Sequence, residues 1–425
     1  MPKYSIGEWK SITIDETFHS TDQSILAQLR LSDRIEIDEL KEGIRIKAKS
    51  WVGLIHFQDF EIQVVPKLAG ENLGLVNMLT YTAGVAALKR YKNERYLEIL
   101  EKGSLFDLIV WVFCDACEKI LAGGLLFDYE RQEESLTSIR GRLLIDKQYR
   151  RRFGQIDRLE CRFDEHSSNI LENQLLALGL FKAGSLVQDD QIRIRARKLW
   201  SILSEVCRID QIDIDSARYE ITYNRLNDHY RDAHQLAWMI IDGLGVEDLF
   251  KSTLTPSFAF LLDMNSLFEQ FLNKYLTEIL RKNKLVLTYQ HHDRSIIWDI
   301  FQNRSYSQVI PDFLISSGNT SNRLAVDAKY KVYDTRKVDP GDISQVFLYA
   351  YAYDHSSQPT AVVIFPTEEK TDQRSSMMIR QSHYPNGAKI HVLGINIPEA
   401  LGEIQEKKPG NNASFFTNVF TSCLG

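Results

Sequence analysis

The spacing of apolar residues changes along this chain, and that change limits what the chain can fold into. From about residue 10 to residue 67, apolar and polar residues alternate in short runs such as IRIKA and FEIQVVPK, a period of two that is typical of strands. From Leu73 to Leu121 the runs lengthen to the helical pattern of SLFDLIVWVFCDACEKILAGG, which ends in a pair of glycines. We therefore expect a β-rich unit that helices cover or follow.

The middle of the chain combines a basic run with three amphipathic segments. The basic run contains these residues: Arg140, Arg142, Lys147, Arg150, Arg151 and Arg152. Two interpretations stay open, contact with phosphate or a partner protein, and an ordinary solvated surface balanced by Asp157 and Glu160. The segments SSNILENQLLALGLFKAG, IRIRARKLWSILSEV and NRLNDHYRDAHQLAWMIIDGL follow, and their periodicity predicts a helical connector.

The last third of the chain has a different order of elements. Its apolar runs predict, in order, a helix in SFAFLLDMNSLFEQFLNKYLTEILRKN, the strands LVLTYQ, PDFLIS and RLAVDAKYK, a helix in ISQVFLYAYAY, and the strands TAVVIFP and KIHVLGINI. We therefore expect an α+β multidomain protein. It would have a β-rich amino-terminal domain with helices over residues 1–130, the basic block and helical connector over 131–252, and a carboxy-terminal α/β domain over 253–425.

Charge and composition narrow the class of protein. With a formal net charge of -6 over 425 residues, the chain as a whole repels phosphate, which argues against a protein that only coats DNA. The amino terminus lacks the apolar run of a secretory signal, and no stretch approaches the roughly 20 apolar residues that span a bilayer. We therefore expect no membrane contact and a cytoplasmic location. Cys114 and Cys117 lie in an apolar run without a second Cys or His pair, which favours buried helix thiols over a metal site.

Two short motifs in the last third carry the chemistry. Pro311-Asp312 opens one predicted strand and Asp327-Ala328-Lys329 lies on the next, with the turn-rich SSGNTSN between them. A hairpin would bring the two aspartates together, and residues two apart on a strand point to the same face, so Asp327 and Lys329 would project together toward Asp312. We therefore expect three charges to converge at one place.

Such a cluster predicts a divalent cation. Two carboxylates about 4 Å apart repel by about 4 kcal/mol at a protein-like dielectric, unless a cation or a proton relieves the repulsion. Mg²⁺ prefers a few carboxylate oxygens and leaves positions open for phosphate, so Asp312, Asp327 and the carbonyl of Ala328 are the expected ligands. Mn²⁺ is the expected substitute. Lys329 would add positive charge near the reacting phosphate, and whether it stays protonated or accepts a proton stays open.

This arrangement resembles the PD-(D/E)xK nuclease superfamily. The matching residues are Pro311-Asp312 and Asp327-Ala328-Lys329, with Asp327 where many members have Glu. The superfamily's layout implies two further catalytic residues, Glu269 on the preceding helix, where it would also contact the metal, and Gln345 on the following helix. A neighbouring group, His291-His292-Asp293, fits a polar strand end near the nuclease groove better than a metal site, because neighbouring histidines on a strand face opposite sides.

Beyond the catalytic motif, the chain resembles the McrC family, the nuclease subunits of McrBC-type modification-dependent restriction systems. The segments WVGLIHFQDFEIQVVPKL, GRLLIDKQYRRRF, SSNILENQLL and NRLNDHYRDAHQLA carry this resemblance. It implies a subunit that docks on a hexameric McrB-like AAA+ GTPase, stimulates its GTPase, and cuts double-stranded, modified DNA. The family's amino-terminal part stimulates the GTPase, which implies that the β-rich domain over residues 1–130 contacts the partner, with the basic block as a further candidate. The chain has no G-x-x-x-x-G-K-[ST] phosphate loop, which fits a motor on a separate chain. Two alternatives are a stand-alone repair or recombination nuclease and a non-cutting scaffold that activates the motor.

Overall fold

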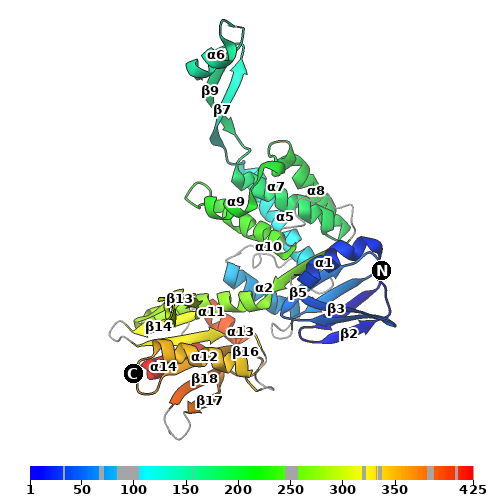
Figure 1. Ribbon diagram of the computed structural model, residues 1–425. Coiled ribbons are helices and arrows are strands. Elements are labelled where there is room, and N and C mark those ends of the chain that lie inside the picture. Colours follow the sequence, from blue (N-terminus) through cyan, green and yellow to red (C-terminus); the bar gives the residue numbers. More distant parts are fainter. Residues whose placement is uncertain are drawn as a thin grey trace. The chain divides into compact units, whose positions relative to one another are not determined.

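The computed structural model describes residues 1–31, 34–66, 71–83, 105–155, 157–244, 257–317, 322–331, 333, 337–380, 387–406 and 410–424. Its contacts divide the chain into two compact units, residues 1–92 together with 255–425, and residues 93–254 (Figure 1). We expected three consecutive domains. The first unit instead joins both ends of the chain, because strand β10 (Phe258–Asp263) pairs with strand β5 (Trp51–His56).

The amino-terminal part of the first unit is built from two small sheets, as the alternating pattern predicts. One has the order β1-β6-β5-β10 and the other β2-β4-β3. In β4 the apolar side chains of Ile44, Ile46 and Ala48 are buried and the residues between them are exposed or half-buried. The remaining elements are β1 (Lys3–Gly7), β2 (Ser11–Ile14), α1 (Gln23–Leu31), β3 (Ile35–Leu40), β4 (Gly43–Ala48), β6 (Glu61–Val65) and α2 (Glu71–Ala83).

Strand β10 occupies a segment that we expected to be the start of a helix. FAFLLD is a short apolar run, and periodicity alone does not distinguish a strand from a helix in such a run. The segment is a strand because it pairs with β5. Gly53 of β5 has a φ of 143°, and the Phe260 carbonyl lies so close to it that a side chain at Gly53 would clash. Helix α11 (Met264–Leu280) then begins, because the side chain of Asp263 accepts a hydrogen bond from the backbone of Asn265.

The carboxy-terminal part of the first unit contains a mixed six-stranded sheet of order β11-β14-β15-β16-β18-β17. The strands β11, β14 and β15 are antiparallel neighbours, whereas β15, β16 and β18 run parallel. Every residue of β16 is buried, as expected for a strand covered on both faces. The elements are β11 (Leu285–Tyr289), β14 (Phe313–Ser317), β15 (Arg323–Ala328), α12 (Pro340–Tyr353), β16 (Thr360–Thr367), β17 (Asp372–Arg380), β18 (Gly387–Asn396), α13 (Ile397–Glu406) and α14 (Asn411–Leu424).

The second unit is a group of helices with an arm. Its helices include α5 (Leu105–Gly123), α7 (Leu171–Leu186), α8 (Asp190–Ser204), α9 (Ile214–Glu220) and α10 (Arg231–Leu244). The three amphipathic segments predicted α7, α8 and α10, and the run SLFDLIVWVFCDACEKILAGG predicted α5, whereas α9 was not predicted. Cys114 and Cys117 are buried in α5, as expected, and burial raises the pKa of both thiols. The residue-130 boundary that we expected between the first two domains lies inside strand β7, and α5 packs against α8 and α10.

The arm consists of β7 (Asp128–Leu136), β8 (Arg142–Leu143), α6 (Ile145–Arg152) and β9 (Leu159–Ser167), and Figure 1 shows it projecting from the helices of its unit. A buried asparagine holds its base. The Asn173 side chain donates hydrogen bonds to the carbonyls of Leu126 and Ser168, which lie at the two ends of the arm, and accepts one from the Tyr230 hydroxyl. None of the described helices is long and apolar enough to cross a membrane.

Candidate active site

The hairpin of β14 and β15 brings the two expected aspartates together. The strands are antiparallel, with Phe313 opposite Val326, so Asp312 just before one strand meets the end of the other. The backbone N–H of Ala328 donates a hydrogen bond of 2.7 Å to Oδ2 of Asp312. The convergence that the motif spacing predicts is therefore present in the structure.

The two carboxyl groups lie in surroundings that oppose a double negative charge. The side chain of Asp327 is only 1% exposed. Burial raises the pKa of Asp312, and the neighbouring charge of Asp327 raises it further. Burial likewise raises the pKa of Asp327, although the ammonium of Lys329 acts in the opposite direction. A cation at this place would relieve both effects.

Lys329 lies beside the carboxylates and is held from its other side by a glutamine. Its Nζ is 2.9 Å from Oδ2 of Asp327 and donates a hydrogen bond of 3.0 Å to Oε1 of Gln345 on α12. Burial lowers the pKa of Lys329 and is the largest single effect. The charge of Asp327, its hydrogen bond with the ammonium, and the charges of Asp312 and Asp342 together outweigh burial, so the pKa ends above its ordinary value. In this arrangement Lys329 is therefore an ammonium.

The glutamine is itself positioned by a tyrosine that we did not expect in the site. Nε2 of Gln345 donates to the hydroxyl of Tyr349, 2.8 Å away, and that hydroxyl donates to the carbonyl of Ile310 at 3.1 Å. The chain of hydrogen bonds thus runs from Lys329 to the backbone two residues before Asp312. The signal for it in the sequence was the spacing of Gln345 and Tyr349, four apart on one helix face.

Glu269 lies at the border of the cluster. From α11, its Oε1 accepts a hydrogen bond of 2.8 Å from the side chain of Gln290, whose backbone N–H donates to the carbonyl of Asp312 at 2.8 Å. The charge of Glu269 contributes to the raised pKa of Asp312. Gln290 was not among the expected site residues. Its φ of 45° is rare for a residue with a side chain, and it turns the backbone as β11 ends.

The donor set fits a hard divalent cation. Carboxylate oxygens of Asp312 and Asp327 are the ligands that Mg²⁺ prefers, and burial raises the pKa of both carboxyls although Lys329 lies beside them. Within the described part of the chain, no three His, Cys, Asp or Glu side chains are arranged to hold a metal ion together. Two aspartates with a backbone carbonyl, for which Ala328 is the candidate, and water would therefore form the site.

The basic run lies on the arm of the second unit. Arg140, Lys147 and Arg152 pair with acidic side chains of the same arm, which are, in that order, Glu165, Glu133 and Glu160. About half of the run is thus balanced locally, as the solvated-surface interpretation expects. The apolar side chains of Ile145 and Tyr149 on α6 and of Phe153 directly after it are exposed at intervals of four residues. This helix therefore exposes an apolar stripe as well as charged side chains.

Comparisons with known proteins assign the chain to a class and then to a family. A family profile described as McrBC 5-methylcytosine restriction system component matches residues 46–366. Because that match covers more than half of the chain, the protein is a component of a restriction system. It belongs to the McrBC family, which confirms the resemblance seen in the sequence. No curated protein sequence matches the chain significantly.

Two solved structures from Thermococcus gammatolerans are similar to this chain. A chain of the refined half-complex from the tetradecameric assembly of McrB AAA+ hexamers with bound McrC is 15% identical, with a TM-score of 0.57, and the match covers 95% of this chain and 100% of that one. A chain of the McrBC complex determined by cryo-electron microscopy is 17% identical over 65% of this chain and 88% of that one, with a TM-score of 0.45. At this identity the first similarity concerns the fold alone.

Proposed function

We propose that this protein is the DNA endonuclease subunit of a McrBC-like restriction complex and that it hydrolyses phosphodiester bonds with Mg²⁺. The observation that carries the proposal is the cluster of one buried carboxyl group, Asp327, one half-buried carboxyl group, Asp312, and one ammonium at the end of the β14–β15 hairpin. In this proposal the sheet around that hairpin, with α11 before it and α12 after β15, is a PD-(D/E)xK nuclease core.

Each residue of the cluster has a role in this proposal. Asp312, Asp327 and the Ala328 carbonyl would hold the cation, with Glu269 at its border. When bound, Mg²⁺ or its substitute Mn²⁺ supplies a water of lowered pKa and positive charge for the phosphate. Lys329 adds a second positive charge next to Asp327, where it stabilises the negative charge that grows on the phosphate oxygens. Gln345 accepts a hydrogen bond from Lys329 and so fixes the direction of the ammonium.

The family supports docking on a hexameric, GTP-hydrolysing AAA+ partner of the McrB type, whose GTPase the chain would stimulate. The sequence has no phosphate loop of its own, so the motor would be a separate chain. The similar T. gammatolerans assembly contains McrB hexamers with bound McrC. The arm supplies a surface for such a contact, because Ile145, Tyr149 and Phe153 expose apolar area that a partner would bury.

The substrate in this proposal is double-stranded, modified DNA in the cytoplasm. The formal net charge of -6 disfavours tight DNA binding by the chain alone, so the partner would hold part of the DNA and recognise the modified base. Binding of duplex DNA by the isolated chain should accordingly be weak. Strong, salt-sensitive binding of duplex DNA by the isolated chain would contradict this division of labour.

The test is DNA cleavage by the purified chain with Mg²⁺, with and without the partner and GTP, on methylated and unmethylated DNA. Cutting that needs the complete mixture and methylated DNA supports the proposal. Cutting by the chain alone would indicate a stand-alone nuclease, and GTPase stimulation without cutting would indicate a scaffold. Asp327→Asn should abolish cutting, whereas the same change at the exposed Asp59 of the same unit should leave it unchanged.

A further inference from the structure

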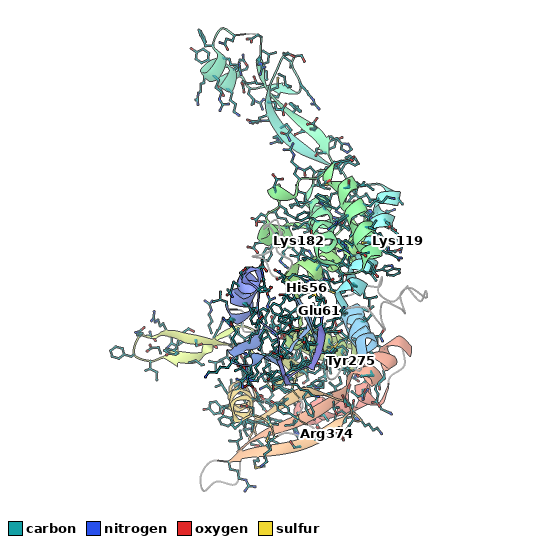
Figure 2. All side chains as sticks on the ribbon, turned by 90° about the vertical axis from the view of Figure 1, so that its right-hand side faces the viewer. His56, Glu61, Lys119, Lys182, Tyr275 and Arg374 are labelled. Carbon is teal, nitrogen blue, oxygen red and sulfur yellow. The ribbon has the colours of Figure 1, made fainter. Side chains whose placement is uncertain are left out.

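A two-stranded ribbon stands beside the candidate active site and was not expected from the sequence. Strands β12 (Asp293–Asp299) and β13 (Arg304–Val309) pair with each other and with no other described strand. Figure 2 shows this pale yellow hairpin extending from the rest of its unit with its side chains in the open. Its strands lie between β11 and β14, the strand that follows Asp312.

The tip of the ribbon presents apolar side chains in a fixed turn. Ile300 is 90% exposed and Phe301 is 98% exposed. The side chain of Asp299 accepts a hydrogen bond of 2.9 Å from the backbone of Gln302, and Asn303 has a left-handed φ of 48°. This geometry defines the turn, so the two apolar side chains are held outward rather than left on a loose loop.

Both ends of the ribbon are anchored at the candidate site. On the entering side, the backbone of Gln290 donates to the carbonyl of Asp312. On the leaving side, the carbonyl of Ile310 accepts the hydrogen bond of Tyr349. Ile296 and Ile297 pack against the hydrophobic cluster under α12. The ribbon is therefore a continuation of the framework that positions Asp312 and Gln345.

The surface of the ribbon suits duplex DNA. Arg294 and Arg304 are exposed, and within the described residues neither forms an ion pair, so both guanidinium groups are available for phosphate. The seven residues of β12 span roughly 23 Å, enough to follow the DNA on one side of a phosphate bound at Asp312. The major groove, about 12 Å wide, admits a two-stranded ribbon, and apolar side chains inserted between base steps unstack them.

We propose that the β12–β13 ribbon grips the duplex next to the cut and that Ile300 and Phe301 press against the bases there. The inference rests on the proposed nuclease function. Duplex DNA is favoured over a second copy of the chain or another protein for two reasons. The ribbon begins and ends at the residues that would bind the cut phosphate, and within the described residues neither Arg294 nor Arg304 forms an ion pair, although Asp299 lies opposite Arg304.

The test compares the double variant Ile300→Ala/Phe301→Ala with wild type in the complete mixture of full-length chain, partner, GTP and Mg²⁺. We expect cutting to slow by about tenfold or more, since losing one stacked aromatic contact weakens nucleic-acid binding to about that extent. GTPase stimulation and the mass of the complex should not change. Tyr219→Ala, an exposed aromatic of the other unit, is the matched control and should cut normally.

A second readout separates this inference from the nuclease proposal. On a duplex with 2-aminopurine beside the cut position, fluorescence should rise when the wild-type complex binds, should fail to rise with the double variant, and should return with Ile300→Leu/Phe301→Trp. A wild-type complex that unstacks the probe without cutting would defeat the nuclease proposal alone. Unchanged cutting by the double variant would overturn the ribbon's role, and so would a loss of complex mass, which would show that the tip binds protein.

Discussion

The candidate active site and the arm are both rich in charged side chains, but these side chains lie in opposite surroundings. At the site, the half-buried Asp312 lies next to the buried Asp327, and each has a raised pKa. On the arm, pairs such as Arg131 with Asp164 lie in solvent, where an ion pair contributes about 1 kcal/mol or less. What the arm leaves exposed without a partner in the described structure is the apolar area of α6. Carboxyl groups whose pKa the fold raises indicate a catalytic or metal site, whereas exposed apolar area indicates a surface that binds a partner protein.

The largest effect should come from removing a carboxylate of the site. Asp312→Ala and Asp327→Ala should each abolish cutting, at least about a thousandfold, because one remaining carboxylate does not hold the cation for catalysis. Cleavage kinetics in the complete mixture measure the effect. Partner GTPase stimulation is the control and should persist, since the arm is untouched. Retained cutting by either variant would remove that aspartate from the site.

Lys329→Ala should come next, with a loss of cutting of about a hundredfold to a thousandfold, the usual effect of removing one group that stabilises transition-state charge. The buried Asp327 would also lose its neighbouring cation. Single-turnover cleavage at saturating Mg²⁺ is the measurement, with Lys331→Ala as the matched control because that lysine pairs with Asp342 instead. If the variant cut as fast as the wild type at saturating Mg²⁺, Lys329 would serve only to balance Asp327.

A buried histidine in the second unit provides a contrast with the buried aspartates. Nε2 of His234 lies 2.9 Å from the carbonyl of Glu172 and donates to it, and in the neutral ring Nδ1 accepts from the Tyr223 hydroxyl. Burial lowers the pKa of His234 to about 4. Below pH 6.5 the unfolded chain takes up a proton that the folded chain does not, so stability falls as the pH drops from about 6.5 to 4.

The loss should reach about 3 kcal/mol, from a pKa difference of roughly two and a half units. Urea unfolding between pH 7 and pH 4.5 measures it. His234→Gln, which does not titrate, should show a correspondingly weaker fall in stability. An identical pH dependence of wild type and variant would mean that folding does not change the pKa of His234.

Removing the apolar stripe of α6 should have a smaller effect, and one confined to the partner. Tyr149→Ala/Phe153→Ala should weaken docking and the stimulation of the GTPase by about tenfold or more, because exposed aromatics that a partner buries are common energetic centres of an interface. Titration of the chain against GTPase rate is the measurement. Stability should be unchanged, since neither side chain is buried. Normal stimulation would place the partner contact elsewhere.

The smallest effect should come from the arm's exposed ion pairs. Arg131→Ala should change the free energy of unfolding by less than about 1 kcal/mol and leave GTPase stimulation unchanged. Chemical denaturation and the same GTPase titration measure both. A loss of stimulation as large as that of the α6 variant would show that the arm acts through charge, and the contrast with the candidate site would then fail.

The sequence predicted the elements whose signal is local. The spacing between Asp312 and Asp327, with turn residues between them, was enough to predict the hairpin that joins them. The strand FAFLLD was wrongly expected to be helical, because what makes it a strand is its pairing with β5, about two hundred residues away in the chain.

Two other parts of the site depended on contacts that periodicity does not encode. The β12–β13 ribbon has two irregularities in its register, which break the alternation by which a strand is identified. Gln290 contacts Glu269 and Asp312 only because the backbone turns at a positive φ after β11. In both cases a tertiary arrangement, rather than a local pattern, gives the residue its place.

The most direct test of the central claim is the binding of Mn²⁺, as a stand-in for Mg²⁺, by the full-length chain without DNA or partner. Calorimetry of the wild type should show a site that Asp312→Asn/Asp327→Asn loses and that Asp59→Asn keeps, because the cation compensates the two neighbouring carboxylates. Equal Mn²⁺ binding by the wild type and the double variant would contradict the account, since the carboxylates would then not form the metal site.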